Sequence, residues 1–379
     1  MPNAVIAGYS RSPFTISFKG DLKGLRPEDL LSQVINDLIS KTKVDKEDIE
    51  DVIVGCAFPE GEQGFNIGKV VTFMCGFPKT VAGMTVNRWC GSSMQSIHNA
   101  AGSIAMGSGK VFVCAGVESM TRVPMLGFNP MPHPKLLEEN PNVYLSMGIT
   151  AENVAKKYSI DRKEQQDFAI SSHEKAFKAQ GKGNFEEEIT VINNGNNNVS
   201  MDGGIRPGTS QEILDGLKLA FDENGTVTAG TSSPLTDGAA ATLICEEEYA
   251  KINKLEILAR IKSTAVNGCE PEVMGLGPIG ASFKALKRAG IEPKNLDLIE
   301  LNEAFASQSL ACVKDLKLNH KHVNIDGGAI ALGHPLGATG ARITGKAAQL
   351  LKREGKQYAL ATQCIGLGQG IATVLEAVN

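Results

Sequence analysis

Apolar residues along this chain follow two spacings, which together predict alternating strands and helices. Short continuous apolar runs predict buried strands at 5–7, 52–54, 111–115, 257–259, 298–301 and 358–363. Apolar residues three or four positions apart predict two amphipathic helices, the first over 91–106 and the second around 343–351. Alternation of this kind is typical of mixed or parallel sheets that carry helices on both faces.

The two sets of elements are related by a constant shift. Residues 44–53 match 291–300 in pattern, which is a shift of 291 − 44 = 247, and the same shift pairs the strand at 111–115 with the one at 358–362. A shift that holds over about 75 residues without a gap indicates two homologous halves. We therefore predict a duplicated α/β protein with five layers, α/β/α/β/α.

A segment of different composition and pattern separates the halves. From about 118 to 240, prolines and glycines interrupt the pattern, a helical stretch covers 151–180, and asparagine dominates 193–198. A long irregular insertion in a compact protein is usually functional, and we interpret this one as a lid. The predicted organisation is an N-terminal half formed by 1–117 plus 236–252, a loop domain over 118–235, and a C-terminal half over 253–379.

Composition and charge narrow the function classes. The formal net charge is −4 and no dense basic run occurs, so we expect no nucleic-acid partner. No segment approaches the roughly 20 apolar residues of a membrane span, and no signal peptide is recognisable, so a cytoplasmic protein is expected. Eight cysteines without a CxxC pair argue against a disulfide framework and against a zinc site, and we expect reduced thiols and no metal.

Cys90 is the first candidate for chemistry. It lies at the start of the predicted helix 91–106, in the sequence NRWCGSSM, where the helix dipole and free N–H groups would favour the thiolate. The small residues that follow it would let a substrate approach closely. These features predict a nucleophile that carries an acyl group as a thioester.

His334 lies in a glycine-rich stretch, 327–340, of the C-terminal half. The shift of 247 places Cys90 opposite Gly337, three residues from His334, so the two groups lie on equivalent turns that can face each other. A histidine there could take the thiol proton and afterwards face a developing oxyanion.

Two further polar side chains follow buried strands of the C-terminal half. Cys364 begins the sequence CIGLGQG, and a second thiol suits the transfer of a proton to or from an α-carbon when a carbon–carbon bond breaks or forms. Asn302 ends the strand at 298–301, where its amide could hold a water or donate to an oxyanion. Helix capping is the structural alternative for Asn302.

These residues and their surroundings resemble the thiolase family over essentially the full chain. The matching segments are the Cys90 turn, 117–120 (VESM), 147–153 (MGITAEN), 230–241, 302–305 (NEAF), 327–342 and 364–368 (CIGLG). The resemblance implies a thiolase-like five-layer body with an inserted loop domain. It also implies reversible, CoA-dependent cleavage of 3-ketoacyl-CoA to acetyl-CoA plus acyl-CoA, or condensation of two acetyl-CoA to acetoacetyl-CoA.

The resemblance further implies a division of roles. Cys90 would become acylated, His334 would activate it, and Cys364 would move the proton at the α-carbon. One oxyanion site would consist of His334 and a water on Asn302. The other would consist of the backbone N–H groups of Cys90 and Gly366.

Binding residues and partners are implied in the same way. The insertion would hold coenzyme A, with Ser233 near the pantetheine and Met147 lining the acyl site. Coenzyme A and acyl-CoA would be substrates, with no permanently bound cofactor, and the assembly would be a homodimer or homotetramer. The chain has Ser93 where the family usually has glycine, and Ser146 where the acetyl-specific branch has histidine, so chain-length preference remains open.

Three alternatives compete with this interpretation. Residues 340–346 have the spacing of a phosphate-binding loop, but Ala347 stands where a Ser or Thr is needed, and the segment lies in a helical pattern. A non-catalytic acyl-CoA carrier of the same fold would lack turnover of acetoacetyl-CoA. A ketosynthase-like condensing enzyme would use a carrier protein and would pair its cysteine with two histidines, whereas this chain has Asn302 and Cys364 where the second histidine and its neighbourhood would be.

Overall fold

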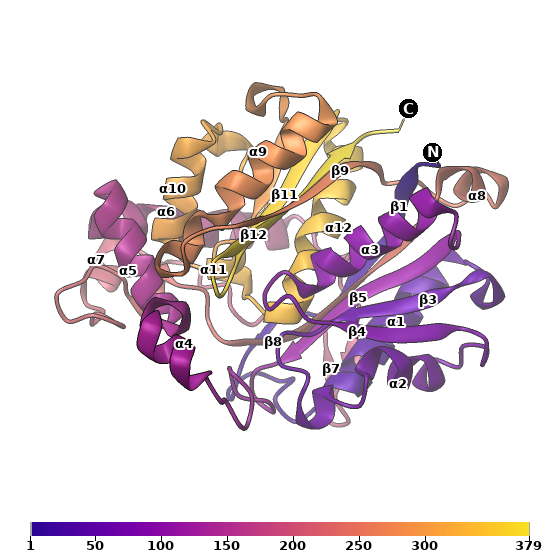
Figure 1. The fold of residues 1–379 in the computed structure, drawn as a ribbon, viewed down its shortest axis with the longest axis horizontal. Coiled ribbons are helices and arrows are strands. Elements are labelled where there is room, and N and C mark those ends of the chain that lie inside the picture. Colours follow the sequence, from indigo (N-terminus) through magenta and orange to yellow (C-terminus); the bar gives the residue numbers. More distant parts are fainter. Residues whose placement is uncertain (1, 379) are drawn as a thin grey trace.

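A large mixed sheet forms the framework of the molecule (Figure 1). The structure is a computed structural model, and it describes residues 2–378. Its strands lie in the order β10-β11-β12-β9-β1-β8-β5-β3-β4, and the short β2 pairs with β8. Strand bounds are β1 Ala4–Arg11, β2 Thr15–Ile16, β3 Asp51–Gly55, β4 Ala82–Val86, β5 Val111–Ser119, β8 Thr236–Glu246, β9 Ala259–Gly268, β10 Leu298–Leu301, β11 Tyr358–Ile365 and β12 Gln369–Glu376.

The strand order divides into two related halves. β4, β3, β5, β8 and β1 come from the first half, and β9, β12, β11 and β10 come from the second. The halves meet where β1 pairs with β9 through only two residue pairs, Val5 with Arg260 and Ile6 with Ala259. The two predicted sheets are therefore joined edge to edge along one short seam.

Helices cover both faces of each half-sheet. The larger ones in the body are α1 Pro27–Thr42, α2 Ile67–Met74, α3 Ser92–Met106, α9 Gly277–Ala289, α10 Ala306–Asp315 and α12 Leu336–Glu354. α1 and α2 pack on the outer face of the N-terminal half, and α9 and α10 pack on the outer face of the C-terminal half. α3 and α12 lie against each other between the two half-sheets, which confirms the five predicted layers.

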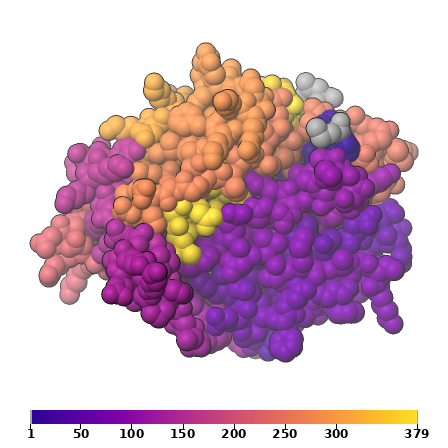
Figure 2. Space-filling model, in the orientation of Figure 1, coloured from indigo at the N-terminus to yellow at the C-terminus, as the bar shows by residue number. Residues whose placement is uncertain are grey.

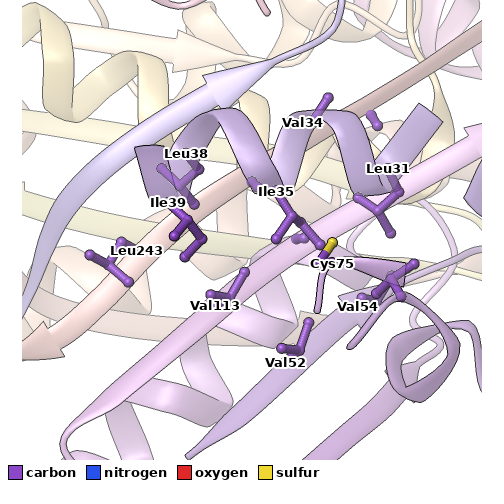
Figure 3. Close-up of a cluster of buried hydrophobic side chains, with 14 of the residues drawn as sticks. Leu31, Val34, Ile35, Leu38, Ile39, Val52, Val54, Cys75, Val113 and Leu243 are labelled. Carbon is purple, nitrogen blue, oxygen red and sulfur yellow. The ribbon is translucent and has the colours of Figure 1, made fainter. Parts of the chain in front are cut away.

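The period of two along each strand explains this layering. Val52 and Val54 of β3 face outward into the cluster under α1, as Figure 3 shows, whereas Ile53 between them faces the central helices. In β11, Ala361 faces the centre and Leu360 faces α9. A strand that is buried on both faces reads as a continuous apolar run, which is why these strands were visible in the sequence.

The shift of 247 residues is reproduced by the secondary structure. It carries β3 onto 298–302, where β10 lies, and β5 onto 358–366, where β11 lies. The shift does not relate the first strands of the two halves, β1 and β9. The strand that the apolar run predicted at 257–259 is wrong except for its last residue, because β9 begins at Ala259. Ile257 and Leu258 are partly buried, which accounts for the apolar run, but they lead into the strand.

The insertion lies between the end of β5 and the start of β8, and its helices form one side of the molecule in Figure 1. The helix predicted over 151–180 is two helices, α5 Met147–Tyr158 and α6 Arg162–Gly181. Ser159 ends the first in a left-handed conformation (φ 54°), and Asp161 and Glu164 form a capping box that starts the second. The DxxE spacing at 161–164 was the signal for this break.

Buried ion pairs attach the insertion to the body. Glu188 of the insertion accepts from Arg11 of β1 and from Lys346 of α12, both at 2.8 Å. Asp202, also in the insertion, accepts from Arg11 at 2.7 Å. Because these groups are almost fully buried, separating them would leave uncompensated charges, so this part of the insertion is fixed to both halves.

The fold decides one of the sequence alternatives. Residues 340–346 lie inside α12 and are buried, so the phosphate-loop alternative is excluded. Between residues 2 and 378, none of the helices combines the length and the apolar character required to span a membrane.

Candidate active site

A tight turn places Cys90 just before the first residue of α3, Ser92. Trp89 has a positive φ of 46°, an uncommon conformation for a bulky side chain. The turn is held by the Asn87 side chain, which accepts from the Trp89 N–H at 2.9 Å, and by the Ser92 hydroxyl, which donates to the Trp89 carbonyl at 2.6 Å. Cys90 itself is buried, with 3% of its surface exposed.

The electrostatic surroundings of Cys90 differ from the sequence expectation. Burial raises the pKa of the thiol to about 12, although the backbone N–H groups of Gly366 and of Cys90 favour the thiolate. The nearby carboxyl of Glu118 raises that pKa further. Burial thus opposes the thiolate that the helix start was expected to favour, because the cost of removing the charge from water outweighs the helix-end effect.

His334 lies on a turn that begins at Gly333, whose φ of 109° suits glycine. Its ring Nδ1 lies 2.6 Å from the Thr339 hydroxyl, and that hydroxyl donates to the Pro335 carbonyl at 3.0 Å. Thr339 must then accept from Nδ1–H, so Nε2 carries a lone pair that can accept a hydrogen bond or act as a base. Burial and the charge of Arg342 lower the pKa of His334 to about 3, so the ring is neutral.

Asn302 follows β10 directly and joins the His334 turn to the sheet. Its backbone N–H donates to the Thr362 carbonyl at 3.0 Å, and its Nδ2 lies 3.3 Å from His334 Nε2. Its Oδ1 is buried and has no hydrogen-bond partner within residues 2–378. A buried unpaired oxygen beside a base indicates a place for a water or a substrate group.

Cys364 is the last but one residue of β11 and is 1% exposed. Burial raises the pKa of its thiol well above the usual value, and the neighbouring Cys90 raises it further. Gln363, the residue before Cys364, donates its side-chain amide N–H to the Cys90 carbonyl. The two thiols predicted from separate halves of the sequence are thus neighbours.

Glycines permit this close approach of the two halves. A Cβ on Gly366 would lie 2.5 Å from the Trp89 ring, and a Cβ on Gly340 of α12 would lie 2.2 Å from the Met94 backbone nitrogen of α3. Ser93 has a local explanation: its buried hydroxyl accepts from the Ala341 N–H at 2.8 Å and ties α3 to α12. Larger residues at the glycine positions would separate the helix ends that carry the cysteine and the histidine.

A largely apolar cavity of about 350 Å³ is lined by Trp89, the residue before Cys90, and by Gly366, two residues after Cys364, although neither thiol lines it. Met147, the first residue of α5, lines it and also packs in the cluster that contains Cys364. Its lining comes from the insertion, from Phe58 and Trp89 of the N-terminal half, and from Met274, Gly366 and Leu367 of the C-terminal half. In Figure 2 a yellow part of the C-terminal half is visible between the magenta insertion and the purple N-terminal half. Larger hollows of about 560 and 760 Å³ touch none of these residues.

Ser233 lies apart from that cavity. Its backbone N–H and its hydroxyl both donate to the Ala304 carbonyl, at 3.0 and 3.2 Å, so it lies against the segment that begins with Asn302. Within residues 2–378, no three histidine, cysteine or acidic side chains lie close enough to hold a metal ion. All eight cysteines are free thiols, as expected.

Sequence analysis assigned no individual role to two residues that shape the site, although both lie in segments that resemble the family. Thr339, five residues after His334, fixes the tautomer of the ring, and the only available signal was its place in a helix start. Glu118 lies under both turns, and a carboxylate inside the otherwise apolar run of β5 could have marked it. Neither role is visible without the three-dimensional contacts.

Comparisons with known proteins agree with this geometry. A family model described as thiolase, N-terminal domain, matches residues 4–248, and one described as thiolase, C-terminal domain, matches residues 255–377. A 3-ketoacyl-CoA thiolase of Shewanella frigidimarina is 47% identical over 391 residues, covering 100% of both chains. One of Bacillus subtilis is 43% identical over 389 residues, covering 99% of this chain and 100% of the relative. The crystal structure of human mitochondrial 3-ketoacyl-CoA thiolase matches with a TM-score of 0.92 and 36% identity, covering 100% of this chain and 99% of that one.

Proposed function

This chain belongs to the thiolase family, and we propose that it catalyses the reversible, CoA-dependent cleavage of 3-ketoacyl-CoA to acetyl-CoA and a shortened acyl-CoA. The observation that carries this proposal is the buried convergence of Cys90, Cys364 and the His334–Asn302 pair beside an apolar cavity. A carrier without turnover would need neither a second thiol nor an oriented base, and a ketosynthase would lack this second thiol.

Acylation is the first step that the geometry supports. His334 Nε2 takes the proton of the Cys90 thiol while the sulfur attacks the 3-keto carbon, and the carbonyl electron pair moves onto its oxygen. Because both groups are neutral before the step, proton transfer accompanies carbon–sulfur bond formation. The backbone N–H groups of Cys90 and Gly366, and His334 with a water on Asn302, would supply the two oxyanion sites.

Cleavage of the carbon–carbon bond then needs an acid. When the oxyanion collapses, the bond between C2 and C3 breaks and its electron pair moves to C2, which takes the Cys364 proton to give acetyl-CoA. The raised pKa of Cys364 suits this role, because the side chain holds a proton at neutral pH. A CoA thiol next gives its proton to the Cys364 thiolate and attacks the acyl carbon on Cys90. The bond between that carbon and the Cys90 sulfur breaks, acyl-CoA leaves, and the Cys90 sulfur takes back the proton held by His334.

The insertion is proposed to hold the CoA part of the substrate. Its residues supply most of the cavity lining, including Met147 at the acyl end. Ser233 is proposed to meet the pantetheine, and its hydrogen bond to the Ala304 carbonyl, which holds it beside the Asn302 segment, supports this. One of the matching human thiolase structures is a complex with CoA, at the same TM-score of 0.92.

A homodimer or homotetramer in the cytoplasm is proposed as the working state. β4 lies at the end of the sheet order, and exposed apolar side chains gather on it and on the neighbouring α2 segment: Phe65, Phe73, Met74 and Met84. An unpaired edge strand flanked by exposed apolar residues favours association with another chain. Light scattering of the purified protein would show a single monomeric mass if this part is wrong.

One experiment tests the proposed reaction. The protein is incubated with acetyl-CoA and digested, and mass spectrometry locates the acetyl group, which is expected on Cys90. A second sample receives acetoacetyl-CoA and CoA, and the enolate absorbance should disappear. Acetylation that persists in Cys90→Ala, or an unchanged absorbance with the native protein, would contradict the proposal.

A further inference from the structure

Glu118, at the end of β5, is a buried carboxylate with several donors, and no cationic side chain among residues 2–378 lies within hydrogen-bond distance of it. It is 1% exposed. Oε2 accepts from the backbone N–H groups of Ala57 and Gly337, both at 2.8 Å. Oε1 accepts from the Gln63 amide at 2.8 Å and from the Phe58 N–H at 3.3 Å. A carboxylate satisfied by this many N–H groups is fixed in position.

These donors come from turns that belong to opposite halves. Gly337 is the second residue of α12 and lies three residues after His334. Ala57 and Phe58 follow β3, and the Asn87 amide of the Cys90 turn donates to the Ala57 carbonyl at 3.0 Å. The Trp89 and Phe58 rings pack edge to face at 5.4 Å. Glu118 therefore links the support of the Cys90 turn with the turn that carries His334.

The duplication places this link at a defined point. Gly337 is the counterpart of Cys90 under the shift of 247 residues, and Glu118 lies at the end of β5, whose counterpart is β11. At the active site, the N–H of Gly366 from the end of β11 approaches the sulfur of Cys90. At the counterpart site, the carboxylate from the end of β5 receives the N–H of Gly337. Each half thus contacts the helix start of the other: the C-terminal half donates an N–H group at Cys90, and the N-terminal half accepts one from Gly337.

We propose that Glu118 is a positioning residue: its carboxylate sets the separation of the His334 imidazole and the Cys90 thiol by joining the two turns that carry them. The inference rests on the proposed function and assigns no bond-making step to Glu118. Its effect should appear only in steps that need both groups, above all the acylation of Cys90.

The test is a double-mutant cycle on the rate of Cys90 acetylation by acetyl-CoA. Glutamine at position 118 must turn an NH₂ group toward one pair of N–H donors, so Glu118→Gln loosens one of the two turns. A misplacement of about 1 Å can cost roughly 100-fold, so we expect acetylation to slow on the order of 10- to 100-fold. In His334→Ala the same change should alter the remaining rate by less than about twofold, because the group that Glu118 positions is absent.

Controls separate positioning from folding. Cys56→Ala removes a buried thiol 3.7 Å from Glu118 Oε1 but none of the N–H donors, and should acetylate at close to the native rate. If Glu118→Gln fails to fold, Glu118→Asp keeps the charge and is too short to reach both turns, so the same cycle applies. Equal losses with and without His334, or no loss, would overturn the inference. Native protein that is not acetylated at all would contradict the proposed function, and the inference would fall with it.

Discussion

Replacing Cys364 by alanine separates the two thiols most directly. The side chain is 1% exposed and packs with Ala151, Met274 and Phe305. Losing one buried atom of this size costs about 1 kcal/mol, which is small beside the roughly 5–15 kcal/mol that stabilises a folded domain. We therefore expect Cys364→Ala to fold, so that any loss of rate reports on chemistry.

The two steps should respond differently. Acetylation of Cys90 needs the Cys90 thiol and His334, so Cys364→Ala should still accept an acetyl group from acetyl-CoA. Cleavage of acetoacetyl-CoA also needs a proton at the α-carbon, and its rate should fall by roughly 10²–10⁴-fold, the usual effect of a positioned acid or base. That loss corresponds to about 3–5 kcal/mol of activation free energy.

Two assays measure these steps on the same preparation. Intact-mass spectrometry after mixing with acetyl-CoA follows acetylation, and the loss of acetoacetyl-CoA enolate absorbance after adding CoA follows cleavage. Cys269→Ala is the matched control, since Cys269 is a neighbouring, only partly buried thiol outside the proposed chemistry. A Cys364→Ala protein that cleaves acetoacetyl-CoA at the native rate would refute this division of labour.

Three further predictions follow from burial and charge. Because burial raises the pKa of Cys90 to about 12 and lowers that of His334 to about 3, both groups stay neutral in between. The acetylation rate should show no inflection from about pH 5 to 8, and an inflection near the ordinary histidine value would contradict this. Lys346→Met should lower the free energy of unfolding in urea by about 3 kcal/mol, because it leaves Glu188 and Asp326 each short of a buried cation. If the apolar cavity takes the acyl chain, kcat/KM for 3-ketoacyl-CoAs should rise about fourfold for each added methylene until the cavity is full, since each buried methylene is worth about 0.8 kcal/mol; a decline beyond four carbons would exclude that placement.

The sequence was most informative where local pattern and function coincide. The strands that are buried on both faces, the helix starts at Cys90 and His334, and the 247-residue shift were all readable, because each follows from short-range periodicity or from a repeat. The protonation state of Cys90 was not readable, since it depends on desolvation by residues from both halves. The same limit applies to Thr339 and Glu118, whose roles arise from contacts made only after the halves pack.

The duplication gives each candidate catalytic residue a counterpart in the other half, but only one of the two equivalent sites combines cysteine, histidine and asparagine side chains. Subtracting or adding 247 gives the counterparts of Cys90, His334, Cys364 and Asn302, which are Gly337, Asn87, Val117 and Gly55. A Cβ on Gly55 would lie 2.2 Å from the Ser93 backbone nitrogen. The counterpart place is therefore filled by backbone, and glycine is the residue that fits there.

Gly337→Ala tests whether this closed counterpart supports the active one. The added Cβ would lie 2.7 Å from the Val117 carbonyl oxygen and 2.8 Å from Glu118 Oε2, so the start of α12 must shift. Overpacking of this kind costs about 1–3 kcal/mol, and we expect a lower melting temperature together with slower acetylation of Cys90. Gly102→Ala is the matched control: it lies in α3 with no atom within 4 Å of its added Cβ, and should stabilise the protein by up to about 1 kcal/mol. A Gly337→Ala protein as stable and as active as Gly102→Ala would show that the two helix starts are not held at a fixed separation, because the counterpart place would then have room that the structure denies it.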